Sequence, residues 1–147
     1  MNKYFFFEKM IGKKLSSIGH AADMIWIIIE DISVHLQAEA VFYLRGQILA
    51  QTSDIYQETG TLGVRGNRPQ TSFDVKIEDL FYFQKEFVVL EVTTDSELNL
   101  QIAFSGGLVI RTIPDGNLEQ DDEKWRIFIK GSNLPHLVAE EGSISWC

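Results

Sequence analysis

Apolar residues alternate with polar ones along several short segments of this chain. This period of two constrains the fold more than any other feature of the sequence. Three isoleucines share one face of MIWIII (24–29), and apolar residues occupy every second position of LNLQIAF (98–104). The same alternation runs through ISVHLQA (32–38) and LVIRTIP (108–114). Successive side chains of a strand point to opposite faces, so these segments predict half-buried β-strands.

One segment departs from this alternation. In TSFDVKIEDLFYFQKEF (71–87), Ile77, Leu80 and Phe81 recur at helical spacing, and Asp74 is positioned to cap a short helix. The stretch before it is rich in glycine and other turn residues. The sequence therefore predicts a loop and one short helix within residues 52–87.

Turn residues separate the strand segments. Ser-Gly-Gly at 105–107 predicts a tight hairpin, because glycine adopts a positive φ without strain. At 147 residues the chain is expected to form a single domain, 1–147.

The two halves of the chain resemble each other. Three alternating apolar residues of segment 24–29 match three of segment 98–104 at an offset of 75, and YLRGQIL (43–49) matches FIKGSNL (128–134) at an offset of 85. We interpret these matches as pseudo-repeats at about 13–50 and 88–138, although antiparallel strands also resemble one another without common origin. The expected fold is mainly β (α+β), with antiparallel sheets made of two duplicated four-stranded meanders.

Negative charge is concentrated in the second half. The net charge is -8, and residues 76–147 contain thirteen acidic and six basic residues, whereas residues 1–75 are nearly balanced. Such a surface repels nucleic acid and acidic membranes and attracts basic proteins. The sequence thus disfavours direct nucleic-acid or membrane binding.

Five acidic residues lie within the nine residues DGNLEQDDE, directly before an apolar segment. The first pseudo-repeat has no counterpart, and nothing within the chain is expected to neutralise this charge. We therefore predict a partner-binding surface whose main residues are Asp115, Glu119, Asp121, Asp122 and Glu123. Glu140 and Glu141 are second candidates, because the last hairpin is expected to lie beside the insertion. The alternative is a solvated hairpin tip that aids solubility.

The sequence contains no motif typical of an enzyme. His20, His35 and His136 match no metal or general-base pattern, and we predict no catalytic residue, no metal site and no cofactor. Cys147 is the single cysteine, which fits a reducing cytoplasm. The most apolar stretch, MIWIII, is too short to span a bilayer.

Two segments carry a resemblance to a known family. WRIFIKGSNLPHLV (125–138) and the upstream ADMIWI (22–27) resemble a family of small bacterial proteins of mostly unknown function, some of which are encoded beside polymorphic toxins. Over nearly its full length the chain is similar to immunity proteins of Gram-positive LXG-type toxin modules. The resemblance implies a cytoplasmic antitoxin that binds and neutralises the C-terminal domain of its cognate toxin. That domain is expected to be a basic nuclease, an RNase in preference to a DNase.

Two other functions remain open at this point. The first is a small ligand-binding or enzymatic β domain, with a pocket at the His20 or His136 end. The second is a self-associating structural protein, in which a sheet edge or the aromatic start KYFFF (3–7) forms a homodimer.

Overall fold

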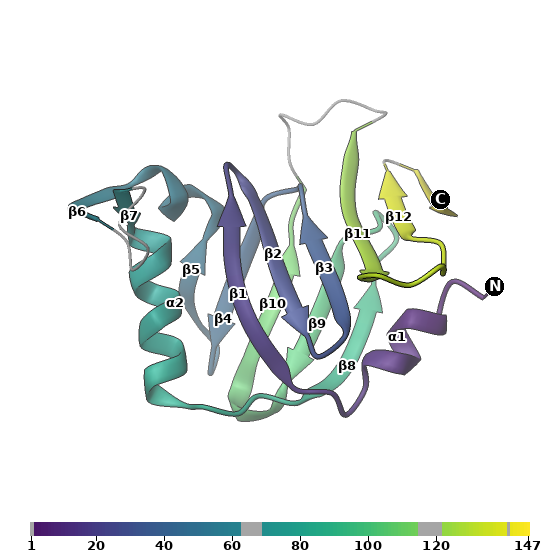
Figure 1. The fold of residues 1–147 in the computed structure, drawn as a ribbon, viewed down its shortest axis with the longest axis horizontal. Helices are drawn as coiled ribbons and strands as arrows, with labels where there is room; N and C mark the ends of the chain where they lie inside the picture. The colour runs from purple at the N-terminus through teal and green to yellow at the C-terminus, as the bar shows by residue number, and fades with distance from the viewer. Residues whose placement is uncertain (1, 63–68, 115–121, 141) are drawn as a thin grey trace.

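The computed structural model of this chain contains two antiparallel β-sheets around one hydrophobic core (Figure 1). It describes residues 2–62, 69–114, 122–140 and 142–147. The six-stranded sheet has the order β1 (Leu15–Ala21), β2 (Met24–Ile29), β3 (Ile32–Leu36), β11 (Glu123–Ile129), β12 (Leu137–Glu140) and β13 (Ser143–Trp146). The five-stranded sheet has the order β5 (Gln47–Gln51), β4 (Ala40–Leu44), β10 (Leu108–Thr112), β9 (Leu100–Phe104) and β8 (Val89–Thr94). The predicted mainly β fold is confirmed.

Both halves of the chain thread the two sheets in the same way. Strands β1, β2 and β3 form a meander in the six-stranded sheet, and the β4–β5 hairpin then joins the five-stranded sheet. Strands β8, β9 and β10 form a meander in the five-stranded sheet, and β11 and β12 then join the six-stranded sheet. The observed unit is therefore a three-stranded meander plus a hairpin in the opposite sheet, rather than one four-stranded meander. Alternation along a strand does not reveal which sheet the strand joins, so this crossover was not visible in the sequence.

The pairing registers of the two halves also match. One continuous row of paired residues crosses the six-stranded sheet: Ile18, Ile27, Val34, Ile127 and Leu137. The equivalent row crosses the five-stranded sheet: Val92, Ile102, Ile110, Phe42 and Ala50. All ten side chains are buried. A register shared through five strands supports the internal duplication that the sequence suggests.

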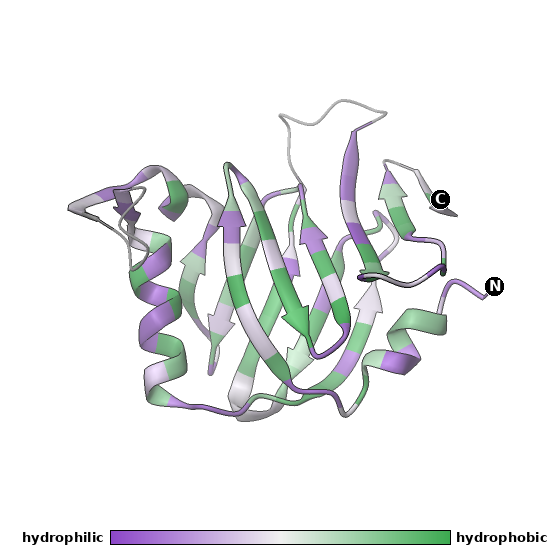
Figure 2. Cartoon of the chain, in the orientation of Figure 1, coloured by the Kyte–Doolittle hydropathy of each residue, from purple (hydrophilic) through white to green (hydrophobic). Residues whose placement is uncertain are grey.

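The core follows from the alternation of apolar residues. Every second residue of β2 and of β9 is buried, and Figure 2 shows apolar and polar positions alternating along these strands. The predicted hairpin between β9 and β10 is also confirmed. Gly106 and Gly107 both have a φ of 80°, a backbone conformation that residues other than glycine rarely adopt.

The predicted helix is α2 (Ser72–Phe83), which packs beside β5 and β1 at one end of the sheets (Figure 1). Ile77 and Leu80 are buried, as expected. The N-cap is Thr71 rather than Asp74. The Asp74 N–H donates to the Thr71 hydroxyl at 3.2 Å, and the Thr71 N–H donates to the Asp74 carboxylate at 3.0 Å. Asp74 is therefore the acidic member of a capping box, three residues after the cap.

The expected loop before α2 contains regular structure. It includes the short 3-10 helix η1 (Thr52–Tyr56) and a small two-stranded sheet of β6 (Glu58–Leu62) and β7 (Pro69–Thr71). Asp54 is buried in η1, and Lys76 of α2 donates to its carboxylate at 3.0 Å. This ion pair joins the segment to the helix.

A second helix, α1 (Phe5–Met10), was not predicted from the sequence. Phe6, Phe7 and Met10 are buried in the core, and the Phe6 ring lies 5.5 Å from the ring of Trp146. Most of the aromatic start therefore packs inside the protein, which weakens the case for it as a dimer surface.

Candidate binding surface

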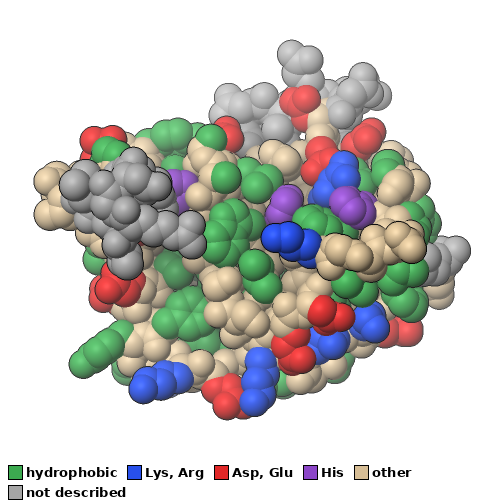
Figure 3. All heavy atoms as spheres, viewed as in Figure 1, with side chains coloured by type: hydrophobic (Ala, Val, Ile, Leu, Met, Phe, Trp, Pro, Cys, Tyr) green, Lys and Arg blue, Asp and Glu red, His purple; other side chains and the backbone are tan. Residues whose placement is uncertain are grey.

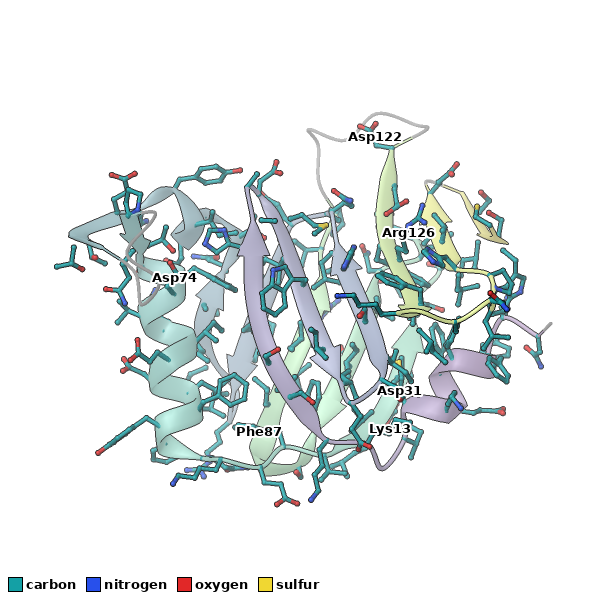
Figure 4. The ribbon with its side chains drawn as sticks, in the orientation of Figure 1. Lys13, Asp31, Asp74, Phe87, Asp122 and Arg126 are labelled. Atoms are coloured by element: carbon teal, nitrogen blue, oxygen red, sulfur yellow. The ribbon has the colours of Figure 1, made fainter. Side chains whose placement is uncertain are left out.

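The predicted acidic surface is described in part. Four of its residues lie outside the described part of the chain: Asp115, Glu119, Asp121 and Glu141. Asp122 is exposed at the start of β11, as Figure 4 shows. Glu123 begins β11 and pairs in register with Glu140 on β12. The expected proximity of Glu140 to the acidic hairpin is thus confirmed.

One predicted contact residue, Glu123, is already paired within the chain. Arg126 donates to both carboxylate oxygens of Glu123, at N–O distances between 2.7 and 3.2 Å. Two strand residues three positions apart normally point to opposite faces. Here the β11–β12 register shifts between Glu123 and Trp125, and this bulge brings Glu123 to the face of Arg126. The expectation that nothing in the chain neutralises the acidic hairpin is therefore wrong at Glu123.

Arg126 also fixes the state of His136. Its Nη1 lies 2.7 Å from His136 Nδ1. A guanidinium offers N–H donors alone, so Nδ1 accepts, and the proton of the neutral imidazole is on Nε2. Burial and the positive charge of Arg126 lower the pKa of His136, while the hydrogen bonds that Arg126 donates to Glu123 raise the pKa of Arg126. At neutral pH the result is a Glu–Arg ion pair with an uncharged imidazole beside it.

Phe128 lies between two histidines on the outer face of the six-stranded sheet. The His136 ring stacks on Phe128, with centroids 4.4 Å apart and planes 17° apart. The His35 ring meets Phe128 edge-on, at 4.9 Å and 88°. Burial lowers the pKa of His35, which keeps this imidazole uncharged at neutral pH. Both geometries are favourable for aromatic pairs and hold the phenyl ring in place.

Trp26 of β2 lies on the same face of the sheet as Phe128 of β11, with β3 between their two strands. It pairs with His35 of β3 on one side and with Gly19 of β1 on the other. The indole ring covers Gly19 so closely that a Cβ at that position would collide with it. Glycine is therefore required at position 19 to let the indole lie against the sheet.

These side chains enclose a shallow hollow, which we call the Trp26–Phe128 groove. It has a volume of about 300 Å³ and a mostly apolar lining of six residues: Trp26, Ile28, Ser33, His35, Phe128 and Lys130. Figure 3 shows hydrophobic side chains in the centre of this face, with histidine and basic side chains beside them. The side chains of Ser33, His35 and Lys130 form no hydrogen bond or ion pair with another described residue.

Sequence reasoning missed the groove, although a signal for it was present. Trp26 and Ile28 occupy the positions of β2 that alternation assigns to the outer face, as does Phe128 in β11. Large apolar residues at outward positions of neighbouring strands indicate an uncovered apolar strip.

The third histidine is structural. His20 Nε2 lies 3.3 Å from Asp74 Oδ1, and His20 Nδ1 lies 2.9 Å from the carbonyl oxygen of Ala22. The pair joins β1 to the first turn of α2, and the two side chains are 7% and 19% exposed. His20 therefore belongs to the packing of the helix rather than to the groove.

Within the described ranges, no group of three or more His, Cys, Asp or Glu side chains is placed to hold a metal ion. None of the helices in this part of the chain is long and apolar enough to cross a membrane.

Compared with known proteins, the chain matches no family model, no curated protein and no solved structure. The resemblance to LXG immunity proteins therefore stays a prediction based on the two quoted segments.

Proposed function

We propose that this protein is an inhibitor that binds another protein, an immunity protein for the C-terminal domain of an LXG-type toxin. The observation that carries the proposal is that one sheet has both an acidic strand end and an uncovered aromatic groove. The acidic end is formed by Asp122, directly before β11, and Glu140 of β12, and the groove includes Phe128 of β11.

The acidic end supports a basic partner. Glu123 is paired with Arg126, and Asp122 and Glu140 are the other described acids at this strand end. A nuclease that handles a phosphate backbone needs a basic cleft, and carboxylates placed before that cleft accelerate association. Charges at the rim of an interface mostly change the association rate and its dependence on salt.

The groove supports a specific complex rather than electrostatic attraction alone. Interfaces derive most of their binding energy from a few desolvated residues, among which tryptophan and arginine are enriched. Trp26 and Phe128 offer two large apolar surfaces on a rigid sheet, and Arg126 lies between the groove and the acidic end. The lining of the groove is mostly apolar, which favours a binding surface over an enzyme active site, because catalysis would need several polar side chains that converge on the substrate.

The function is tested by expressing the toxin domain encoded beside this gene in a sensitive host, with and without this protein. We expect growth to be restored and the two proteins to purify as one complex. Toxicity that this protein does not relieve would contradict the proposal.

The acidic end is tested by the double variant Asp122→Asn with Glu140→Gln. Because rim charges steer association, we expect its association rate to fall about two- to tenfold at low salt and to depend less on salt. The matched control is Glu78→Gln with Asp79→Asn, which removes two exposed acids from α2. Equal slowing by both variants would show that overall charge, and not this strand end, steers the partner.

A further inference from the structure

The Trp26–Phe128 groove has the size of a site for one side chain. Pockets for small ligands occupy about 300 to 1,000 Å³, and this groove lies at the lower limit with about 300 Å³. A cofactor or a nucleotide would extend well beyond it. One aromatic ring would contact the indole and the phenyl walls together.

The two aromatic walls are fixed before any ligand binds. Trp26 is held against Gly19, and Phe128 is held between His35 and His136. Arg126 holds His136 in turn through its Nδ1 atom. Side chains that are already ordered lose little conformational entropy on binding, so the groove is preorganised for a flat, rigid group.

The polar groups of the groove favour an anion. Lys130 contributes a positive charge that no other described residue pairs with, and Ser33 contributes a hydroxyl without a hydrogen-bond partner among the described residues. The imidazole of His35 adds an N–H donor next to them. Donors and a cation beside aromatic walls complement a ring that has a carboxylate close by.

We propose that the Trp26–Phe128 groove is the anchor site of the inhibitor, and that it binds one aromatic side chain of the partner together with an adjacent carboxylate. This inference rests on the proposed function. The ring packs between Trp26 and Phe128, and the carboxylate pairs with Lys130. The acidic strand end sets how fast the partner arrives, and the groove sets how long it stays.

The chemistry of the groove can be tested without the partner. The probe is N-acetyl-L-tryptophan, which has a ring and a carboxylate, and the reference is its neutral amide. In a ¹⁵N–¹H NMR titration we expect the carboxylate probe to shift the Trp26 indole signal and the amides of Ser33 and Phe128. Lys130→Gln should remove the preference for the carboxylate over the amide. The control Lys85→Gln, at another exposed lysine that pairs with no other described residue, should retain it. The proposal would be overturned if the probe left these three signals unchanged. It would also be overturned if Lys130→Gln still preferred the carboxylate probe over the amide.

The role of the groove in the complex is tested by the dissociation rate of the toxin domain. We expect Phe128→Ala to raise this rate at least tenfold, while Tyr43→Ala, at the equivalent position of the other half, leaves it within twofold of the wild type. Lys130→Gln tests the same site with a substitution at an exposed position, which leaves the hydrophobic core intact. If the probe binds but the toxin dissociates equally from all variants, the groove takes a free small molecule and the anchor proposal is overturned. If the toxin does not bind the wild-type protein, the proposed function itself fails.

Discussion

The outer faces of the two sheets differ far more than their inner faces do. The inner rows of both sheets are apolar and buried, with the same register through five strands. On the outer faces, the row through β2, β3 and β11 contains Trp26, His35 and Arg126, and the equivalent row through β9, β10 and β4 contains Gln101, Arg111 and Val41. In the next row, Phe128 corresponds to Tyr43.

This difference separates the requirements of folding from those of binding. The five-stranded sheet forms with the same topology although it has no indole and no imidazole at these outer positions. The fold therefore does not require the residues of the Trp26–Phe128 groove. Their presence on one face alone points to a role in recognition.

The largest expected effect tests the equivalence of the inner faces. Ile127 and Phe42 occupy the same place in the two inner rows, and both are fully buried. We expect Ile127→Ala to lower the free energy of unfolding by about 2–5 kcal/mol and Phe42→Ala by about 3–5 kcal/mol, because each leaves a cavity. Urea unfolding measures both, with Lys85→Ala as the surface control. A loss below about 1 kcal/mol for one of them would break the equivalence.

An intermediate effect is expected on the outer faces. Gly19→Ala places a methyl group where the Trp26 indole lies, so the ring must move. We expect this overpacking to cost about 1–3 kcal/mol and to shift the Trp26 indole NMR signal. Thr93 occupies the equivalent position beside Gln101, and Thr93→Ala should change stability by no more than about 0.5 kcal/mol. Equal losses for the two variants would mean that the indole does not depend on Gly19.

The smallest expected effect concerns pH. Folding lowers the pKa of His35 and of His136, so below the ordinary value of 6.5 the unfolded chain binds more protons than the folded one. The free energy of unfolding should therefore fall as the pH decreases below about 6.5, and these two groups should have no effect well above it. The hydrogen bond from Lys13 lowers the pKa of Asp31, so this carboxylate stabilises the fold above its ordinary pKa of 3.8, and that stabilisation is lost as the pH falls below 3.8.

The control for this pH dependence is the double variant His35→Gln with His136→Gln. Unfolding curves measured from pH 7.5 to 5 should lose most of their slope in this variant. A slope that persists would place its origin outside these two histidines.

Much of the fold could be predicted from the sequence, because burial of one sheet face imposes a period of two. The strands around Ile27 and Ile102 and the helix around Ile77 follow directly from this spacing. The crossover between sheets depends on contacts between distant strands, such as β3 with β11, which no local pattern contains. Helix α1 is too short to show a helical period.

The candidate site was harder to predict for a related reason. The acidic composition of the second half identified Asp122 and Glu140, but the bulge that turns Glu123 toward Arg126 is a property of strand pairing. The groove likewise forms where β2, β3 and β11 meet, although Trp26 and Phe128 are about a hundred positions apart in the sequence.

The most direct test of the binding face is an NMR titration of the ¹⁵N-labelled protein with the toxin domain. Reporters on the six-stranded sheet are the Trp26 indole and the amides of His35 and Phe128, and reporters on the five-stranded sheet are the amides of Tyr43 and Val109. We expect the first set to shift or broaden at substoichiometric toxin while the second set stays unchanged. Perturbation of the second set, with the Trp26 indole unmoved, would contradict the assignment of recognition to the six-stranded sheet.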